Sequence, residues 1–420
     1  MYRMVFADDG GNLYDHRRLA AAGRTGDRFV EMAAEDLERL PEGASLVLIP
    51  GGTPVGLTRS GRFTALEHNP HAGGKAWAVG ALLPQGYTRT LLPSYVRGRD
   101  EKPLPLYGYA AVAFRNGELY VAARCTDDPD RWNPVHYNTE DLDLLIKAKL
   151  KRHPNNRILR QLARCSLEYR CFTAQNIFYG RWEGGIPVSP SCNASCLGCI
   201  SLQPAECCPS PQLRIDYKPS PEEITEIAVP HLEGGEGSII SFGQGCEGEP
   251  ALASEAIVKA VGRIRLETGL GTININTNAG YTAGIREICL AGLDSIRVSL
   301  ISAREDTYKS YFRPSGYSLA DVRLSVEEAV SRGVYVSLNL LVFPGVTDRE
   351  EEIKALLEFV RNTRVNMIQL RNLNIDPDLL LKNLPESGDN IVGIPALIES
   401  LKEVPGLVLG SFSRPVRREL

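Results

Sequence analysis

Between about residues 185 and 373 the sequence alternates short apolar runs with longer segments of helical periodicity. The apolar runs are bounded by turn residues and predict six strands. These strands are expected at Ile186–Val188, Ser238–Phe242, Thr272–Asn276, Ser295–Ile301, Val334–Phe343 and Val365–Leu370. Six strand–helix units in series require a parallel sheet with helices outside it, and ligands of such sheets bind at the carboxyl ends of the strands.

Two segments carry helix start signals. Ser220 with Glu223 has the pattern of a capping box, and Thr347 with Glu350 repeats it. The sequence predicts helices from these two points and over residues 254–267, 285–291 and 320–331.

The first 140 residues show a different pattern. Their apolar runs, such as Ala110–Phe114 and Leu119–Ala123, are short and broken by Gly, Pro and Asp, which predicts mostly β structure with one or two helices. Residues 141–184 have apolar side chains at helical spacing and are expected to form a helical bridge. We therefore expect an α/β protein in which a mostly β N-terminal domain precedes a partial (β/α)6 parallel barrel. The barrel, with a C-terminal extension, would occupy residues 185–420.

Composition narrows the class of partner. Lys and Arg (47) nearly balance Asp and Glu (51), so the chain has no electrostatic footprint for nucleic acid or an anionic membrane. It has no apolar run long enough to span a membrane and no recognisable export signal, so we expect a cytoplasmic protein. Most of its ten cysteines gather between Cys165 and Cys246, which favours metal or redox chemistry over disulfides.

Cys192, Cys196 and Cys199 follow the first predicted strand with the spacing C-x3-C-x2-C. Thiolates are soft ligands suited to iron–sulfur clusters. Three of them on one loop hold three corners of a cubane and leave the fourth iron open. The alternatives are buried thiols or a zinc site, for which Cys207 or Cys208 would supply the fourth ligand.

The cysteine spacing, its position after the first strand and the six strand–helix units resemble the radical S-adenosylmethionine (SAM) superfamily. The resemblance covers about residues 186–373. It implies a [4Fe–4S] cluster whose open iron chelates SAM, and reductive cleavage of SAM to methionine and a 5′-deoxyadenosyl radical. It also implies an electron donor such as ferredoxin or flavodoxin.

Further segments support this resemblance at the ends of the second and third strands. Gly248-Glu249-Pro250 resembles the Gly-Gly-Glu-Pro motif that binds the SAM amino group, and Thr277-Asn278 resembles the Thr-Asn-Gly turn of the family. The resemblance thus implies cofactor-binding roles for Gly248, Glu249 and Asn278. The alternative for Glu249 is an acidic residue at a helix N-terminus.

The fourth and fifth strands resemble the molybdenum-cofactor-biosynthesis branch. Arg297-Val-Ser299-Leu is similar to its Arg-x-Ser-Leu-Asp segment, and Asn339 matches its fifth-strand Asn. By this resemblance Arg297, Ser299 and Asn339 contact SAM, whereas a surface ion pair for Arg297 and a structural amide for Asn339 are the alternatives. The chain departs from the family pattern at Gly198, where many members have an aromatic residue, and at Ile301, where that branch has an acid.

The remaining cysteines leave a second cluster open as an alternative to buried thiols. The residues concerned are Cys165, Cys171, Cys207, Cys208 and Cys246. No cysteine follows Cys289, so a C-terminal auxiliary cluster and a C-terminal methyl-carrying cysteine are not expected. The segment around His16 has only part of a cobalamin signature.

These features favour hydrogen abstraction over methyl transfer. The substrate would be a protein or peptide, as for the glycyl-radical activating enzymes, or a small metabolite. The motifs identify no catalytic residue beyond those that hold the cofactors. The rival hypothesis is a noncatalytic protein with a structural zinc or iron–sulfur site.

Overall fold

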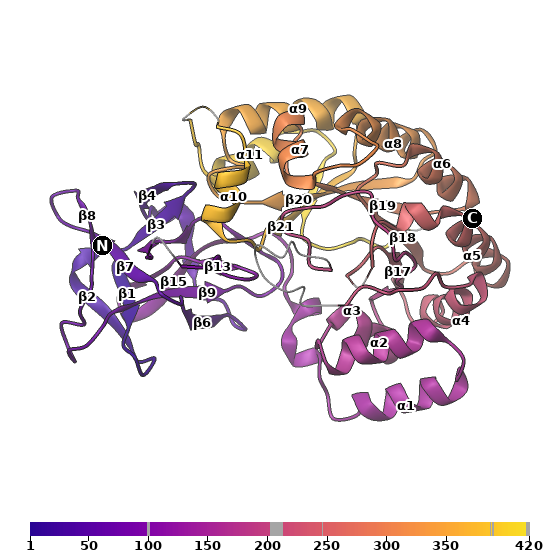
Figure 1. The fold of residues 1–420 in the computed structure, drawn as a ribbon, viewed down its shortest axis with the longest axis horizontal. Helices are drawn as coiled ribbons and strands as arrows, with labels where there is room; N and C mark the ends of the chain where they lie inside the picture. Colours follow the sequence, from indigo (N-terminus) through magenta and orange to yellow (C-terminus); the bar gives the residue numbers. More distant parts are fainter. Residues whose placement is uncertain (99–100, 202–212, 246, 387, 389, 417–420) are drawn as a thin grey trace.

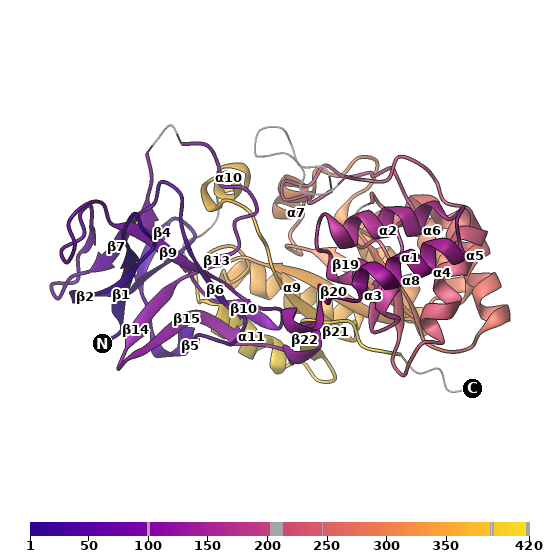
Figure 2. The ribbon, with the colours of Figure 1, turned by 90° about the horizontal axis from the view of Figure 1, so that it is seen from below.

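The structure is a computed structural model that describes residues 1–98, 101–201, 213–245, 247–386, 388 and 390–416. The N-terminal strands lie at one end of the molecule and the parallel sheet with its helices at the other (Figures 1 and 2). No helix in these ranges has the length and apolar character needed to cross a membrane.

The N-terminal part is built from antiparallel strands. Twelve strands form one sheet, whose main path runs in the order β10-β15-β14-β1-β2-β7-β12. The other five strands of this sheet pair beside that path: β5, β6, β8, β9 and β13. A second sheet consists of β11, β3 and β4. The strands are β1 (Arg3–Ala7), β2 (Leu13–Ala20), β3 (Ala22–Thr25), β4 (Arg28–Glu31), β5 (Leu37–Arg39), β6 (Ser45–Leu48), β7 (Thr53–Leu57), β8 (Phe63–Ala65), β9 (Trp77–Leu82), β10 (Tyr87–Arg89), β11 (Leu92–Pro93), β12 (Tyr95–Val96), β13 (Tyr109–Ala110), β14 (Val112–Arg115) and β15 (Glu118–Cys125).

The prediction of one or two helices in this part is wrong, because the only helical segments among the described residues before 142 are single 3-10 turns. These turns are η1 (Ala34–Asp36), η2 (Asp130–Trp132) and η3 (Pro134–His136). Each spans three residues, too few to present an apolar face at helical spacing. Three α-helices then occupy the bridging segment: α1 (Leu142–Arg152), α2 (Arg157–Leu167) and α3 (Phe172–Tyr179).

A parallel sheet of seven strands follows, in the order β16 to β22, and confirms the partial barrel. Its strands are β16 (Glu183–Gly185), β17 (Ile239–Phe242), β18 (Thr272–Thr277), β19 (Ser295–Leu300), β20 (Tyr335–Val342), β21 (Met367–Asn372) and β22 (Val408–Gly410). Its helices are α4 (Pro221–Leu232), the 3-10 turn η4 (Pro250–Ala253), α5 (Ser254–Glu267), α6 (Thr282–Ala291), α7 (Glu305–Phe312), α8 (Leu319–Ser331), α9 (Glu350–Thr363), α10 (Pro377–Asn383) and α11 (Ile394–Lys402).

Three local expectations are wrong. The sheet has seven strands, because the three-residue β22, too short to show a periodic pattern, pairs with β21. The first strand lies before Ile186–Val188, since Val188 N and Ser189 N donate to the Glu247 carboxylate instead of a neighbouring strand. Thr347 does not cap α9: its hydroxyl donates back to Phe343 O, and Arg349 precedes the helix.

The capping box at Ser220 is confirmed. Glu223 N donates to Ser220 Oγ at 3.3 Å, and Ser220 N donates to the Glu223 carboxylate at 2.9 Å. Each interaction satisfies a backbone donor that the first turn of α4 would otherwise leave unpaired.

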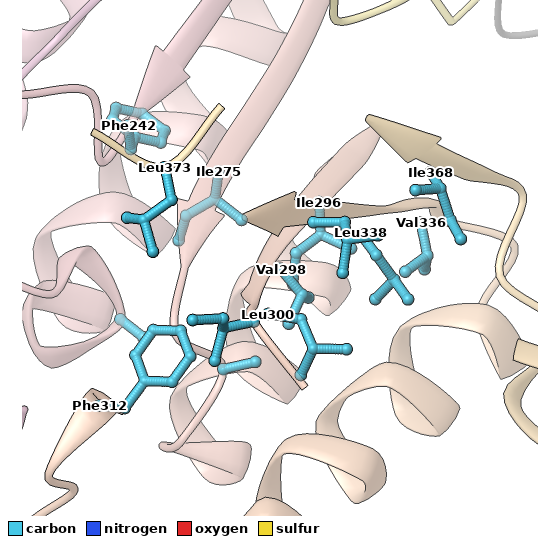
Figure 3. Close-up of a cluster of buried hydrophobic side chains, with 14 of the residues drawn as sticks. Phe242, Ile275, Ile296, Val298, Leu300, Phe312, Val336, Leu338, Ile368 and Leu373 are labelled. Carbon is cyan, nitrogen blue, oxygen red and sulfur yellow. The ribbon is translucent and has the colours of Figure 1, made fainter. Parts of the chain in front are cut away.

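The barrel strands have one apolar and one polar face. Ile296 and Val298 of β19 and Val336 and Leu338 of β20 join one buried cluster, drawn with neighbouring side chains in Figure 3. Because side chains alternate along a strand, the residues between them point to the other face of the sheet. Those residues are Asn274, Asn276, Arg297, Ser299, Ser337, Asn339, Gln369 and Arg371. The barrel therefore has a polar interior.

The N-terminal strands contact the carboxyl ends of β20 and β21. Gly26 N donates to Pro344 O at 3.0 Å, just beyond β20. The fully buried Arg89 donates to Leu373 O at 2.8 Å, just beyond β21. The N-terminal part thus packs against the edge of the sheet where ligands of parallel barrels bind.

The Asp348 carboxyl is fully buried after β20. Its Oδ1 accepts from Gly345 N at 2.6 Å, whereas its Oδ2 has no hydrogen-bond partner within the described ranges. Burial raises the pKa of Asp348 to about 7, although the hydrogen bond from Gly345 N lowers it.

We expect Asp348→Asn to stabilise the protein at pH 8 but not at pH 4. The folded-state pKa lies above the unfolded value of about 3.9, so ionisation of the unfolded chain lowers stability between about pH 4 and pH 7, and the loss persists above pH 7. Asn cannot ionise, so the variant does not lose this stability. The gain in the free energy of unfolding is at most about 4 kcal/mol. Thermal melts of both proteins at the two pH values measure the effect, and an equal shift at both would contradict it.

Candidate functional site

The cysteine loop follows β16 and is held by backbone hydrogen bonds to the end of α7. Ser195 N donates to Phe312 O at 3.1 Å and Leu197 N to Tyr311 O at 3.0 Å. Ser315 N donates to Asn193 O at 2.8 Å from the chain that follows α7. The conformation of the loop is therefore set by main-chain contacts that do not involve the thiols.

The structure brings Cys192, Cys196 and Cys199 together as half-buried thiols. Burial raises the pKa of Cys192 and of Cys196, and the two neighbouring thiols raise that of Cys196 further. Since a ligand must be a thiolate, metal binding here has to release protons.

A cluster and a single zinc ion place different demands on the three cysteines. No group of three or more His, Cys, Asp or Glu side chains in the described ranges is arranged to hold a single metal ion. A zinc ion would need these sulfurs at about 2.3 Å from one point, whereas each cysteine of a cubane binds a different iron. Cys207 and Cys208, the fourth ligands of the zinc hypothesis, lie outside the described residues.

Gly248 and Glu249 pack directly against the cysteine loop. Gly248 N donates to Ser189 O at 2.7 Å and Glu249 N to Ser191 O at 2.8 Å. A Cβ on Gly248 would lie 2.0 Å from Ser191 O, so only glycine permits this approach. Gly248 therefore positions the residue that precedes Cys192.

The Glu249 side chain is 3% exposed and accepts hydrogen bonds from two neighbouring segments. Its carboxylate accepts from Asn278 N at 2.8 Å, from Ala251 N at 3.0 Å and from the Thr277 hydroxyl. Burial raises the pKa of Glu249, and these donors oppose the shift. The structure thus shows the helix N-terminal role, because Glu249 caps η4.

Asn278 connects β18 to the cysteine loop. Its Nδ2 donates to Asn193 Oδ1 at 2.7 Å, and its Oδ1 accepts from Gly280 N at 2.8 Å. Glu249, Asn278 and the cysteine loop therefore form one hydrogen-bonded unit.

Sequence reasoning missed the buried carboxyl of Glu247, which lies in the same unit. It accepts from Val188 N at 2.8 Å, Ser189 N at 3.1 Å and Gly243 N at 2.5 Å. Burial raises the pKa of Glu247 to about 8. An acid two residues before Glu249 was the only signal for it in the sequence.

Arg297 is 11% exposed and lies inside the barrel, so the surface ion pair is wrong. Its Nη2 lies 3.2 Å from Glu183 Oε1, and its Nε donates to Asn276 Oδ1 at 2.6 Å. Its Nη1 donates to Gln369 Oε1 and Ser413 Oγ, both at 3.0 Å. These contacts use four of the five N–H groups of the guanidinium. Glu183, Asn276 and Gln369 were missed from the sequence, although the alternation of polar and apolar residues in β18 and β21 was a signal for the latter two.

A cavity of about 350 Å³ brings Arg297, Ser299 and Asn339 together, whereas Gly248, Glu249 and Asn278 do not line it. Ile200, next to Cys199, also lines it, so the cavity reaches the cysteine loop. Asn339 Oδ1 has no partner in the described part of the chain, nor has Asn276 Nδ2 in the same wall. An unpaired buried acceptor and donor fit a polar ligand with hydroxyl groups, as SAM has on its ribose.

Tyr311 accounts for the departure from the family pattern at Gly198. A Cβ on Gly198 would lie 2.9 Å from the Tyr311 hydroxyl. An aromatic side chain of α7 therefore lies next to Gly198, and a larger residue in the loop would have to displace the Tyr311 hydroxyl.

The structure does not place a second cluster. Cys165 is buried on α2, and Cys171 lines the cavity with its Sγ 3.2 Å from Thr173 Oγ1. Cys246, like Cys207 and Cys208, lies outside the described residues.

Comparison with known proteins gives one family and several distant structures. Residues 186–360 match the model of the radical SAM superfamily. No curated protein matches.

Three solved structures illustrate the structural matches. The maturase HydG of the [FeFe]-hydrogenase matches at 14% identity and a TM-score of 0.38, covering 60% of this chain and 58% of its own. A radical SAM methyltransferase from Sphaerobacter thermophilus matches at 18% identity and a TM-score of 0.35, and the match covers 52% of this chain and 62% of that protein. Methylornithine synthase PylB matches at 16% identity and a TM-score of 0.36, and the match covers 64% of this chain and 69% of that protein. The chain thus spans less than two thirds of the first two of these proteins.

The family match coincides with the part of the chain that carries the cysteine loop and β17 to β20. Residues 186–360 of this chain therefore form a radical SAM domain, the enzyme domain whose cofactors are a [4Fe–4S] cluster and S-adenosylmethionine.

Proposed function

We propose that this protein cleaves SAM reductively and abstracts a hydrogen atom from its substrate. The observation that carries the proposal is the group of three thiols on one loop, which main-chain hydrogen bonds hold beside a polar cavity. When bound there, the cluster and SAM together supply the 5′-deoxyadenosyl radical and methionine. A ferredoxin or flavodoxin would supply the electron, in the cytoplasm.

The residues of this chain bind and orient the cluster, SAM and the substrate. Cys192, Cys196 and Cys199 hold the cluster and leave one iron for SAM. Ser299 and Asn339 contact SAM from the cavity wall. Arg297 lines the same cavity and keeps one N–H group outside its contacts with the protein. The cavity keeps the substrate C–H close to the reacting carbon and limits the access of water.

The direct test is the product of SAM turnover. Anaerobically reconstituted, reduced protein should convert SAM to 5′-deoxyadenosine and methionine in equal amounts, measured by chromatography. S-adenosylhomocysteine as the main product would mean methyl transfer. No consumption of SAM by protein with a verified, reducible cluster would favour the noncatalytic alternative.

A second prediction concerns Glu249, which we propose binds the SAM amino group in addition to capping η4. Glu249→Gln keeps the size of the side chain and one acceptor oxygen but removes the charge. We expect SAM to bind about 10- to 100-fold more weakly, because a hydrogen bond to a charged group contributes about 1.5–3 kcal/mol. Iron content should not change, and titration with SAM measures the affinity.

Glu352→Gln is the matched control. Glu352 is also 3% exposed and also accepts from hydroxyl groups, those of Ser302 and Thr307. It lies on α9, however, whereas Glu249 N donates to Ser191 O beside the cysteine loop. Its variant should bind SAM like the wild type. Equal affinity of the Glu249→Gln and Glu352→Gln variants would reject the role of Glu249.

A further inference from the structure

The cavity extends beyond the residues assigned to SAM. Ser299 and Asn339 lie on β19 and β20, whereas the walls toward β21 and β22 carry Arg371 and the segment Ser411–Phe412. Gln85 and Trp132 of the N-terminal part and Phe172 of the bridging segment complete this region. No role in cofactor binding is assigned to any of these residues.

Arg371 is held in place but only partly used. Its Nη1 donates to Gln85 Oε1 at 3.1 Å and to Ser411 O at 2.9 Å. No described residue accepts from its Nε or Nη2. These two groups form the planar edge of a guanidinium that matches the two oxygens of a carboxylate or phosphate.

The charge of Arg371 has no counterion within the described ranges. Three charged side chains among the described residues line the cavity: Glu183, Arg297 and Arg371. Glu183 pairs with Arg297, so the cavity keeps one net positive charge. A half-buried cation without a counterion is unfavourable, and a bound anion would remove that cost.

The neighbouring wall is aromatic. The Trp132 and Phe412 rings lie 6.0 Å apart between centroids. Phe172 lines the cavity as well, stacked on Tyr137 at 3.8 Å. Such a surface binds an apolar group, and Arg371 lines the same cavity.

We infer that this region is the substrate subsite, and that it takes a small molecule carrying a carboxylate or phosphate on an apolar body. Arg371 binds the oxyanion, and Trp132, Phe172 and Phe412 contact the apolar part. The inference rests on the proposed function and selects the small-metabolite class from its two substrate classes. A cavity of about 350 Å³ lies in the range of small-molecule sites and does not admit a folded protein.

The test is anion binding by the reconstituted protein in the presence of SAM. The probes are benzoate, inorganic phosphate and, as the neutral analogue of benzoate, benzamide. Binding is followed by tryptophan fluorescence, because Trp132 lines the subsite, and Trp132→Phe should remove the change. We expect saturable binding of benzoate or phosphate and much weaker binding of benzamide; the better of the two anions identifies the oxyanion.

Arg371→Gln should weaken the preferred anion about tenfold or more, and Arg371→Lys should weaken it less because it keeps the charge. Arg361→Gln, at an exposed position on α9, is the control and should bind like the wild type. Equal affinity for benzoate and benzamide, no saturable binding, or undiminished binding by both Arg371 variants would overturn the inference. Because this readout needs no turnover, its failure is distinct from a failure to cleave SAM.

Discussion

Replacing Cys192, Cys196 and Cys199 together by alanine should remove the cluster iron, which is about four atoms per chain in the reconstituted wild type. SAM cleavage should be abolished with it. The reason is that these thiols are the only protein ligands we assign to the cluster. Iron analysis and the absorbance of the cluster measure the first effect, and 5′-deoxyadenosine formation measures the second.

The variant should still fold. The loop is anchored through Ser195 N and Leu197 N, which donate to the end of α7 and do not depend on the thiols. Far-ultraviolet circular dichroism should therefore match that of the wild type without its cluster. Cys289→Ala, which removes a buried thiol on α6, is the control and should keep the full iron content. A complete cluster in the triple variant would reject the ligand assignment.

Gly248→Ala should also reduce the iron content strongly, although it changes no ligand. The added methyl group would lie 2.0 Å from Ser191 O and 3.1 Å from Cys192 N, and both are backbone atoms that cannot rotate away. The segment must therefore separate from the cysteine loop and lose the hydrogen bonds of Gly248 N and Glu249 N. We expect less iron per chain after reconstitution and a lower melting temperature.

Gly262→Ala is the matched control, because Gly262 lies within α5 and a Cβ there would meet no atom within 4 Å. Alanine favours a helix over glycine by about 1 kcal/mol, so this variant should keep its iron and melt at the same or a higher temperature. Normal iron content in Gly248→Ala would mean that the close approach to Ser191 does not position the cluster ligands.

Much of the barrel followed from local sequence patterns. The helix from Ser220, the helix over 254–267 and most strands of the parallel sheet lie within a few residues of the expected positions. Their signals are local, since a capping box or an apolar run depends on residues close in the chain. The predictions of the first strand and of the strand number failed where a distant partner decides the outcome, as Glu247 does for Val188 N. The start of α9 failed for a local reason, because the Thr347 hydroxyl donates to Phe343 O and does not cap the helix.

The cysteine triplet and its position after the first strand of a parallel barrel were determined by the sequence alone, because ligand spacing is a property of one short segment. Only the tertiary structure decided that Arg297 pairs with Glu183, and that Arg371 meets Gln85 and an aromatic wall. These partners lie 114 and 286 positions apart. They meet because the sheet curves so that the polar faces of its strands enclose one cavity, and no local pattern records that closure.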